Sequence, residues 1–234
     1  RSSGETKNEQ WFEIKSRMLL QLGKFDEAIE IAEDGIAAFP DSLELKLSKA
    51  VSIAAPLTNG QLIRVGLRTN AELDALKEAE EIFSGCSERL IDRGSKGEST
   101  EVLLNLAAVR MALGNGEGAK EALNVAKTYA PSDERVLDLL VGAKWISGDL
   151  KDAYAEARSF YSLSKSTDSI HKLAAILIAT DRMSQAIELI ELHLEDEQSN
   201  SARVRLLGMK LDALVGSHDR IAAEDYATSL EKEY

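Results

Sequence analysis

A short phrase that recurs along the chain restricts its possible folds more than any other feature. The copies are LGKFDEA at 22–28, LGNGEGA at 113–119 and SGDLKDA at 147–153, with weaker ones at 180–186 and 215–222. The alanines that close the last four copies, Ala119, Ala153, Ala186 and Ala222, follow one another at intervals of about 34 residues. A period of this length is typical of stacked repeats, in which each unit packs only against its neighbours.

Each copy separates two apolar stripes that have the 3.6-residue period of a helix. Leu103, Leu106 and Val109, for example, form the stripe that precedes the copy at 113–119. A glycine in this position supplies the positive φ that ends a helix, and the closing alanine lets two helices approach closely. The sequence therefore predicts antiparallel helix pairs with no sheet. It places Gly23, Gly114 and Gly148 in the turns.

A 34-residue period of helix, tight turn and helix resembles the tetratricopeptide repeat (TPR). The resemblance implies an all-α fold, a right-handed superhelical solenoid of antiparallel helix pairs with about six repeats. We expect a single domain over 10–234, preceded by a flexible segment at 1–9. The second repeat is irregular, because an insertion at about 56–70 separates helices expected at 43–55 and 71–92. Since the chain begins without methionine and stops inside an expected helix, we expect it to be an excerpt of a longer protein.

Charge and composition exclude several classes of partner. The chain has 28 Lys and Arg against 40 Asp and Glu, and the net charge of −12 argues against nucleic acid, because phosphate binding needs clustered cations. RNA reading by helical repeats is disfavoured for the same reason. No apolar run approaches the roughly 18 residues of a membrane helix, so we expect no membrane span. Cys86 is the only cysteine, which forbids an internal disulfide and favours a reducing, cytoplasmic location.

The resemblance implies that a partner binds in a concave groove lined by the first helix of each pair. By that analogy the groove residues are Arg17, Leu104, Met111, Arg135, Asp138, Trp145, His171, Ile178, Arg205 and Met209. Trp145 is the expected anchor, because tryptophan offers large contact area at small entropic cost; the alternative is that it packs between repeats. The carboxylate clamp of chaperone-binding family members is absent. Because a net charge of −12 repels acidic ligands, we expect a basic or apolar protein or peptide as partner.

The insertion is apolar and locally basic within an acidic protein. Its predicted contact residues are Leu62, Ile63, Arg64, Leu67 and Arg68. Apolar side chains in a long loop must be covered, either by the scaffold itself or by a partner. Two interpretations therefore stay open: a packed structural detour, and a partner-contact element whose arginines face an acidic surface.

Enzyme chemistry finds little support in the sequence. The glycines before Lys120 lack the spacing of a phosphate loop, and no Ser or Thr follows the lysine. His171, His193 and His218 lie in separate segments without the spacing of metal ligands. We therefore expect no catalytic residue, metal or cofactor, and we predict a noncatalytic protein–protein interaction scaffold. The alternative is a regulatory or sensor region of a larger enzyme, such as a signalling ATPase or a glycosyltransferase.

Overall fold

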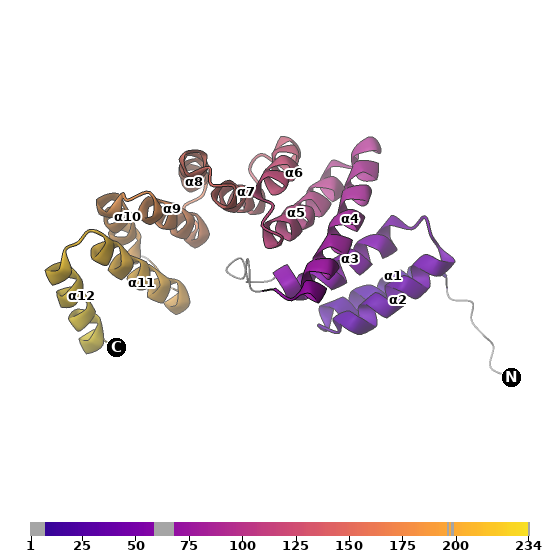
Figure 1. The fold of residues 1–234 in the computed structure, drawn as a ribbon, viewed down its shortest axis with the longest axis horizontal. Helices are drawn as coiled ribbons and strands as arrows, with labels where there is room; N and C mark the ends of the chain where they lie inside the picture. Colours follow the sequence, from indigo (N-terminus) through magenta and orange to yellow (C-terminus); the bar gives the residue numbers. More distant parts are fainter. Residues whose placement is uncertain (1–7, 59–67, 196, 198, 234) are drawn as a thin grey trace. The chain divides into compact units, whose positions relative to one another are not determined.

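A computed structural model describes residues 8–58, 68–195, 197 and 199–233, and within these ranges every regular element is an α-helix (Figure 1). This confirms the all-α prediction. The chain divides into two compact units, Arg1–Pro131 and Ser132–Tyr234. Each unit is described by itself, and a single domain over 10–234 stays a prediction.

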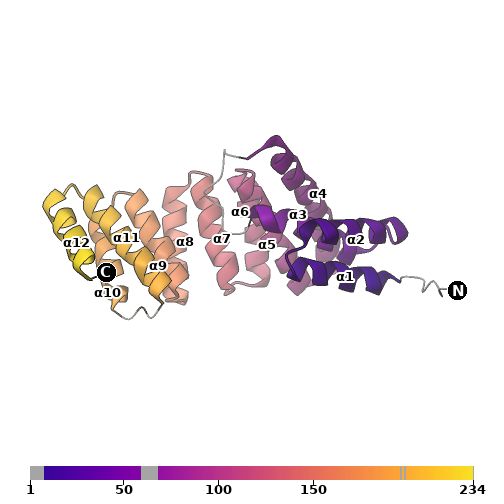
Figure 2. The same ribbon diagram turned by 90° about the horizontal axis from the view of Figure 1, so that it is seen from below.

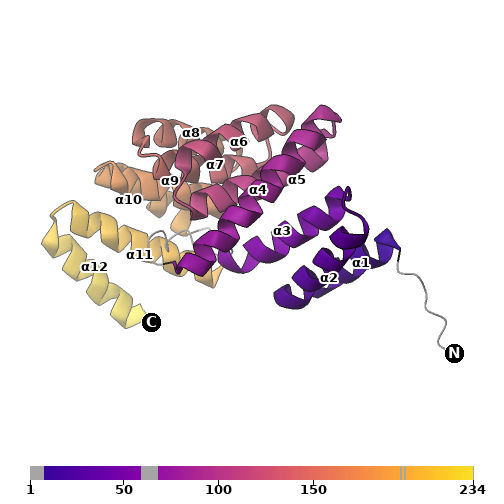
Figure 3. The same ribbon diagram turned by 45° about the vertical axis from the view of Figure 1, so that its right-hand side comes forward.

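Three antiparallel helix pairs build the first unit (Figure 3). Its helices are α1 (Glu9–Gln21), α2 (Phe25–Ala38), α3 (Leu43–Thr58), α4 (Asn70–Asp92), α5 (Lys96–Ala112) and α6 (Gly116–Tyr129). Each helix packs against the next, and α3 also contacts α1 and α5. The first helix of the irregular repeat was expected to end at residue 55. Instead α3 continues through Pro56 to Thr58.

Three further pairs build the second unit. Its helices are α7 (Glu134–Ile146), α8 (Leu150–Leu163), α9 (Thr167–Ala179), α10 (Met183–Leu194), α11 (Asn200–Gly216) and α12 (Arg220–Glu233). The first helices of the pairs, α7, α9 and α11, contact one another in turn and form one layer, with α8 and α10 farther from the viewer in Figure 2. The core is built around α9, whose Ala174 and Ile176 are fully buried.

The turns inside the pairs have the predicted conformation. Gly23, Gly114 and Gly148 have φ values of 70°, 77° and 80°, which confirms their place in the turns. The alanines that close these three copies of the phrase are fully buried, so each helix can approach its partner closely. Gly94, at φ 72°, makes the same kind of turn between α4 and α5. No copy of the recurring phrase predicts a turn at this position.

The two weaker copies replace glycine in the turn with another residue. Asp181 and His218 take φ values of 59° and 61° there, and Asp and His are among the side chains that tolerate this region. The turn at His218 places Ala223, rather than Ala222, at the buried position. The closing alanine of the last copy is therefore corrected to Ala223.

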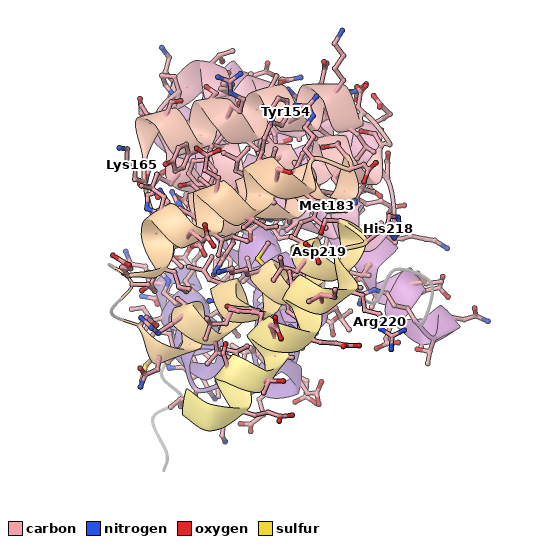
Figure 4. The ribbon with its side chains drawn as sticks, turned by 90° about the vertical axis from the view of Figure 1, so that its left-hand side faces the viewer. Tyr154, Lys165, Met183, His218, Asp219 and Arg220 are labelled. Atoms are coloured by element: carbon pink, nitrogen blue, oxygen red, sulfur yellow. The ribbon has the colours of Figure 1, made fainter. Side chains whose placement is uncertain are left out.

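Gly216, which stands in the last copy of the phrase, has a different structural role. It is the last residue of α11. A Cβ added at this position would lie 2.5 Å from Cε of Met183. Figure 4 shows Met183 beside the segment that carries His218, Asp219 and Arg220. The end of the flexible Met183 side chain of α10 occupies the space that a side chain at position 216 would take, so a larger residue there would require the methionine to move.

Candidate functional site

The layer of α7, α9 and α11 carries most of the predicted groove residues. Helical spacing places Asp138 and Trp145 on one stripe of α7, His171 and Ile178 on one stripe of α9, and Arg205 and Met209 on one stripe of α11. Because α9 contacts both of the other helices, the three stripes adjoin. We call this surface the α7–α9–α11 face.

Charged side chains occupy the N-terminal part of this face. Lys172 of α9 pairs with Asp138 of α7, with 3.4 Å between Nζ and Oδ1. Burial raises the pKa of the Asp138 carboxyl, and the charge of Lys172 opposes that shift. Burial also lowers the pKa of His171, and the positive charge of Arg205 on α11 lowers it further. The neighbouring helices are thus linked electrostatically across their surface.

The C-terminal part of the same face is apolar. Trp145 is 39% exposed, and it is one of the large hydrophobic side chains that the fold leaves accessible. Ile178 and Met209 are half-buried and pack against the core of the second unit. Gly142 and Ala175, which lie between the charged and apolar parts of their stripes, add little side-chain bulk.

Arg135 lies one turn before Asp138, and its side chain is engaged within the chain. Its guanidinium donates to the carboxylate of Asp133, the N-cap of α7, with 2.8 Å between Nη2 and Oδ2. This bond holds the pKa of Asp133 below its usual value. Arg135 is exposed, but the structure shows it as part of the helix cap.

Two predicted groove residues of the first unit are not accessible. Leu104 is 7% exposed and Met111 is 0% exposed, so neither can line an open groove and both assignments are corrected. The physical reason is that α5 is packed by α3, α4 and α6, which leaves it buried around most of its circumference. Arg17, on α1, is exposed as expected.

The first unit presents acidic groups near Arg17. The carboxylates of Glu9, Glu13 and Glu44 lie within 4.8 Å of one another. Burial raises the pKa of Glu13, and the charges of Glu44 and Glu9 raise it further. The three carboxylates give this part of the first unit a local negative charge.

The predicted insertion contact is described only at its edge. Leu62, Ile63, Arg64 and Leu67 lie outside the described residues. Arg68 is described, and its Nη2 donates to the backbone carbonyl of Leu57 at 2.8 Å, which links the end of α3 to the start of α4. The next residue, Thr69, caps α4 through a capping box with Glu72. The arginine is thus engaged by its own chain.

A pocket between α8 and α10 was not predicted from the sequence. It has a volume of about 470 Å³, and its floor is formed by the leucines Leu173, Leu177 and Leu189. Tyr154, Arg158 and Tyr161 stand on the α8 wall at helical spacing. That spacing of two tyrosines and an arginine is a signal the sequence already carried.

A second pocket, of about 460 Å³, lies among α2, α3 and α4 and includes Cys86. The thiol is buried, and burial raises its pKa. A buried thiol with a raised pKa is a weak nucleophile, so this pocket offers no support for cysteine catalysis.

None of the described helices is both long and apolar enough to cross a membrane.

Comparison with known proteins identifies the fold. No protein-family model matches the chain, and no curated protein matches it. TTC0263, a thermophilic TPR protein of Thermus thermophilus, is similar with a TM-score of 0.56 and 18% identity, covering 87% of this chain and 100% of its own. A TPR protein from Parabacteroides merdae has a TM-score of 0.65 at 12% identity, covering 99% of this chain and 80% of its own.

A third neighbour, YrrB, is described as a TPR protein with an unusual peptide-binding site. It has a TM-score of 0.60 at 9% identity and covers 86% of this chain and 92% of its own. Similarity at these identities establishes the architecture. The chain has the fold of a TPR solenoid, as the recurring phrase predicted.

Proposed function

We propose that this protein is a noncatalytic interaction scaffold whose α7–α9–α11 face binds a short segment of a partner polypeptide. The observation that carries the proposal is the exposure of Trp145, at 39%, on the same stripe as Asp138. A large exposed aromatic on the same face as the half-buried Ile178 and Met209 provides an apolar centre of the kind on which binding energy is concentrated. Asp138, Lys172 and Arg205 provide a charged border.

The partner's chemistry follows from the charges of the chain. The net charge of the whole chain is −12. A segment with one bulky apolar side chain and basic neighbours therefore fits better than an acidic one. The alternative function, a regulatory or sensor region of a larger enzyme, stays a prediction that flanking sequence would test.

The test replaces the tryptophan and measures peptide binding. We expect Trp145→Ala to abolish binding to the apolar and basic members of an array of capped peptides. Leu163→Ala is the matched control, because Leu163 is an exposed large hydrophobic on α8, outside the face. Thermal unfolding of both variants separates a binding role from a structural one.

Two results would reject the proposal. One is unchanged peptide binding by Trp145→Ala. The other is a loss of stability of about 3–5 kcal/mol, the cost of truncating a fully buried aromatic, which would show that Trp145 belongs to the core.

A further inference from the structure

The pocket between α8 and α10 lies on the other side of α9 from the α7–α9–α11 face. Leu173 and Leu177 of α9 form its floor together with Leu189 of α10. Its α10 wall ends in Leu192, which is 64% exposed. The helices α8 and α10 each pack on α9, so the pocket is a valley over α9. Such an apolar floor with an exposed apolar rim is suited to bulky side chains from a ligand.

Two arginines converge at one end of this valley. The guanidinium of Arg182, the N-cap residue of α10, lies 4.1 Å from the ring centroid of Tyr154. The guanidinium of Arg158 lies 5.8 Å from the same centroid. The two cationic groups are therefore at most about 10 Å apart, and both lie against the ring of Tyr154.

In the described part of the chain neither guanidinium forms an ion pair with a carboxylate, and both lie against the ring of Tyr154; Glu188 lines the same pocket as Arg158. A ligand carboxylate beside Tyr154 would meet two cationic groups, each of which can donate charge-assisted hydrogen bonds.

We infer that the α8–α10 valley binds an acidic and apolar segment of a partner polypeptide, with a carboxylate beside Tyr154 near Arg158 and Arg182 and apolar side chains on the leucine floor. The valley walls extend over residues 154–161 of α8 and 185–192 of α10. Seven residues of helix rise about 10 Å, which is more than one side chain covers. The occupant is therefore a segment with several contacting residues.

The position of Glu188 determines which end of the bound segment carries the acidic residues. Glu188 lies on the α10 wall beyond Arg182, so a second ligand carboxylate in the middle of the valley would be repelled. The favourable arrangement has acidic residues at the arginine end and apolar residues toward Leu192. The overall charge of −12 opposes the approach of such a segment from a distance, but at about 0.1 M salt that effect is screened beyond about 10 Å.

The probes are capped, fluorescein-labelled peptides with two aspartates followed by Leu, Leu, Ser, Leu and Phe, made in this order and in the reverse order. Fluorescence anisotropy measures their binding to the whole chain. We expect Arg158→Gln and Arg182→Gln each to weaken binding about three- to tenfold. The same peptides with Asn in place of Asp should bind more weakly to the wild type, and Leu192→Ser should weaken binding without affecting the fold because Leu192 is exposed.

Two variants serve as controls. Lys165→Gln removes one positive charge beyond the C-terminal end of α8, away from Tyr154 (Figure 4), and should leave the affinity unchanged. Trp145→Ala should also leave it unchanged, so failure of this inference is distinguishable from failure of the proposed function. The inference is overturned if neither peptide binds at about 1 mM, if the Asn peptides bind as well as the Asp peptides, or if both arginine variants bind like Lys165→Gln.

Discussion

Gly35, in the middle of α2, allows α1, α2 and α3 to meet closely. A Cβ at this position would lie 2.9 Å from Cβ of Phe12 and 2.9 Å from Cδ1 of Leu45. Both neighbours are buried. The Leu45 methyl is at the end of its side chain, but the Cβ of Phe12 is fixed to the backbone of α1 and cannot rotate away. Gly35→Ala must therefore move one helix against another.

Two opposing effects determine the stability of Gly35→Ala. Alanine is favoured over glycine inside a helix by about 0.8–1 kcal/mol, whereas overpacking a tight core costs about 1–3 kcal/mol. We expect a net loss of up to about 2 kcal/mol in the free energy of unfolding. Gly85→Ala is the matched control, because Gly85 is also inside a helix, α4, and no atom lies within 4 Å of its Cβ position. That control should gain about 0.5–1 kcal/mol.

Both glycines belong to the first unit, Arg1–Pro131, so the two variants report on the same part of the chain. Urea denaturation followed by far-UV circular dichroism gives the two free energies under identical conditions. The predicted result is a pair of changes with opposite signs. If Gly35→Ala is stabilised as much as Gly85→Ala, the close packing of α1, α2 and α3 is wrong.

Two further predictions concern His171 and the insertion. In the folded chain the pKa of His171 is below its usual value of about 6.5. As the pH falls, His171 is therefore protonated in the unfolded chain before it is protonated in the folded chain. The stability of the fold consequently decreases as the pH drops from about 6.5 through the folded pKa. His171→Gln should remove that part of the pH dependence. Arg205→Gln should raise the His171 pKa in an NMR titration, and an unchanged pKa would contradict the contribution that we assign to Arg205. Replacing residues 59–67 by a short Gly/Ser linker should leave the first unit folded, because the free energy of closing a loop changes by only about 0.6 kcal/mol per doubling of its length. If the insertion contacts a partner, the same replacement should weaken partner binding. Unfolding of α1–α4 would instead place the insertion in the core.

The helix pairs could be predicted because their periodicity and turn chemistry are local. Gly23, Gly114 and Gly148 marked the turns correctly. The last copy was misaligned because Gly216 resembles a turn glycine, whereas the turn residue is His218 and Gly216 accommodates Met183. Sequence spacing cannot distinguish a glycine needed for backbone conformation from one against which a neighbouring side chain packs.

The candidate site was less accessible to sequence reasoning, because exposure depends on how many neighbours a helix has. Trp145 lies on an outer surface, as expected, but Leu104 and Met111 on α5 are buried by three neighbouring helices. A signal for this was present: the run from Val102 to Val109 is apolar at nearly every position, which indicates a helix buried on all sides. The pairing of Arg158 with Arg182 over Tyr154 joins separate helices, and no spacing in the sequence predicts it.

Helix α9 contributes to both surfaces proposed for the second unit, which raises the question of whether they are coupled. His171 and Ile178 lie on one side of the helix, and Leu173 and Leu177 lie on roughly the opposite side, because each residue turns the chain by about 100°. Ala174 and Ile176, between them, are fully buried. Coupling between the surfaces would need α9 to have two alternative packings, and a close-packed core of this kind resists small displacements. The two surfaces should therefore bind independently, so that a scaffold of short helix pairs can hold two different segments on opposite sides of one helix.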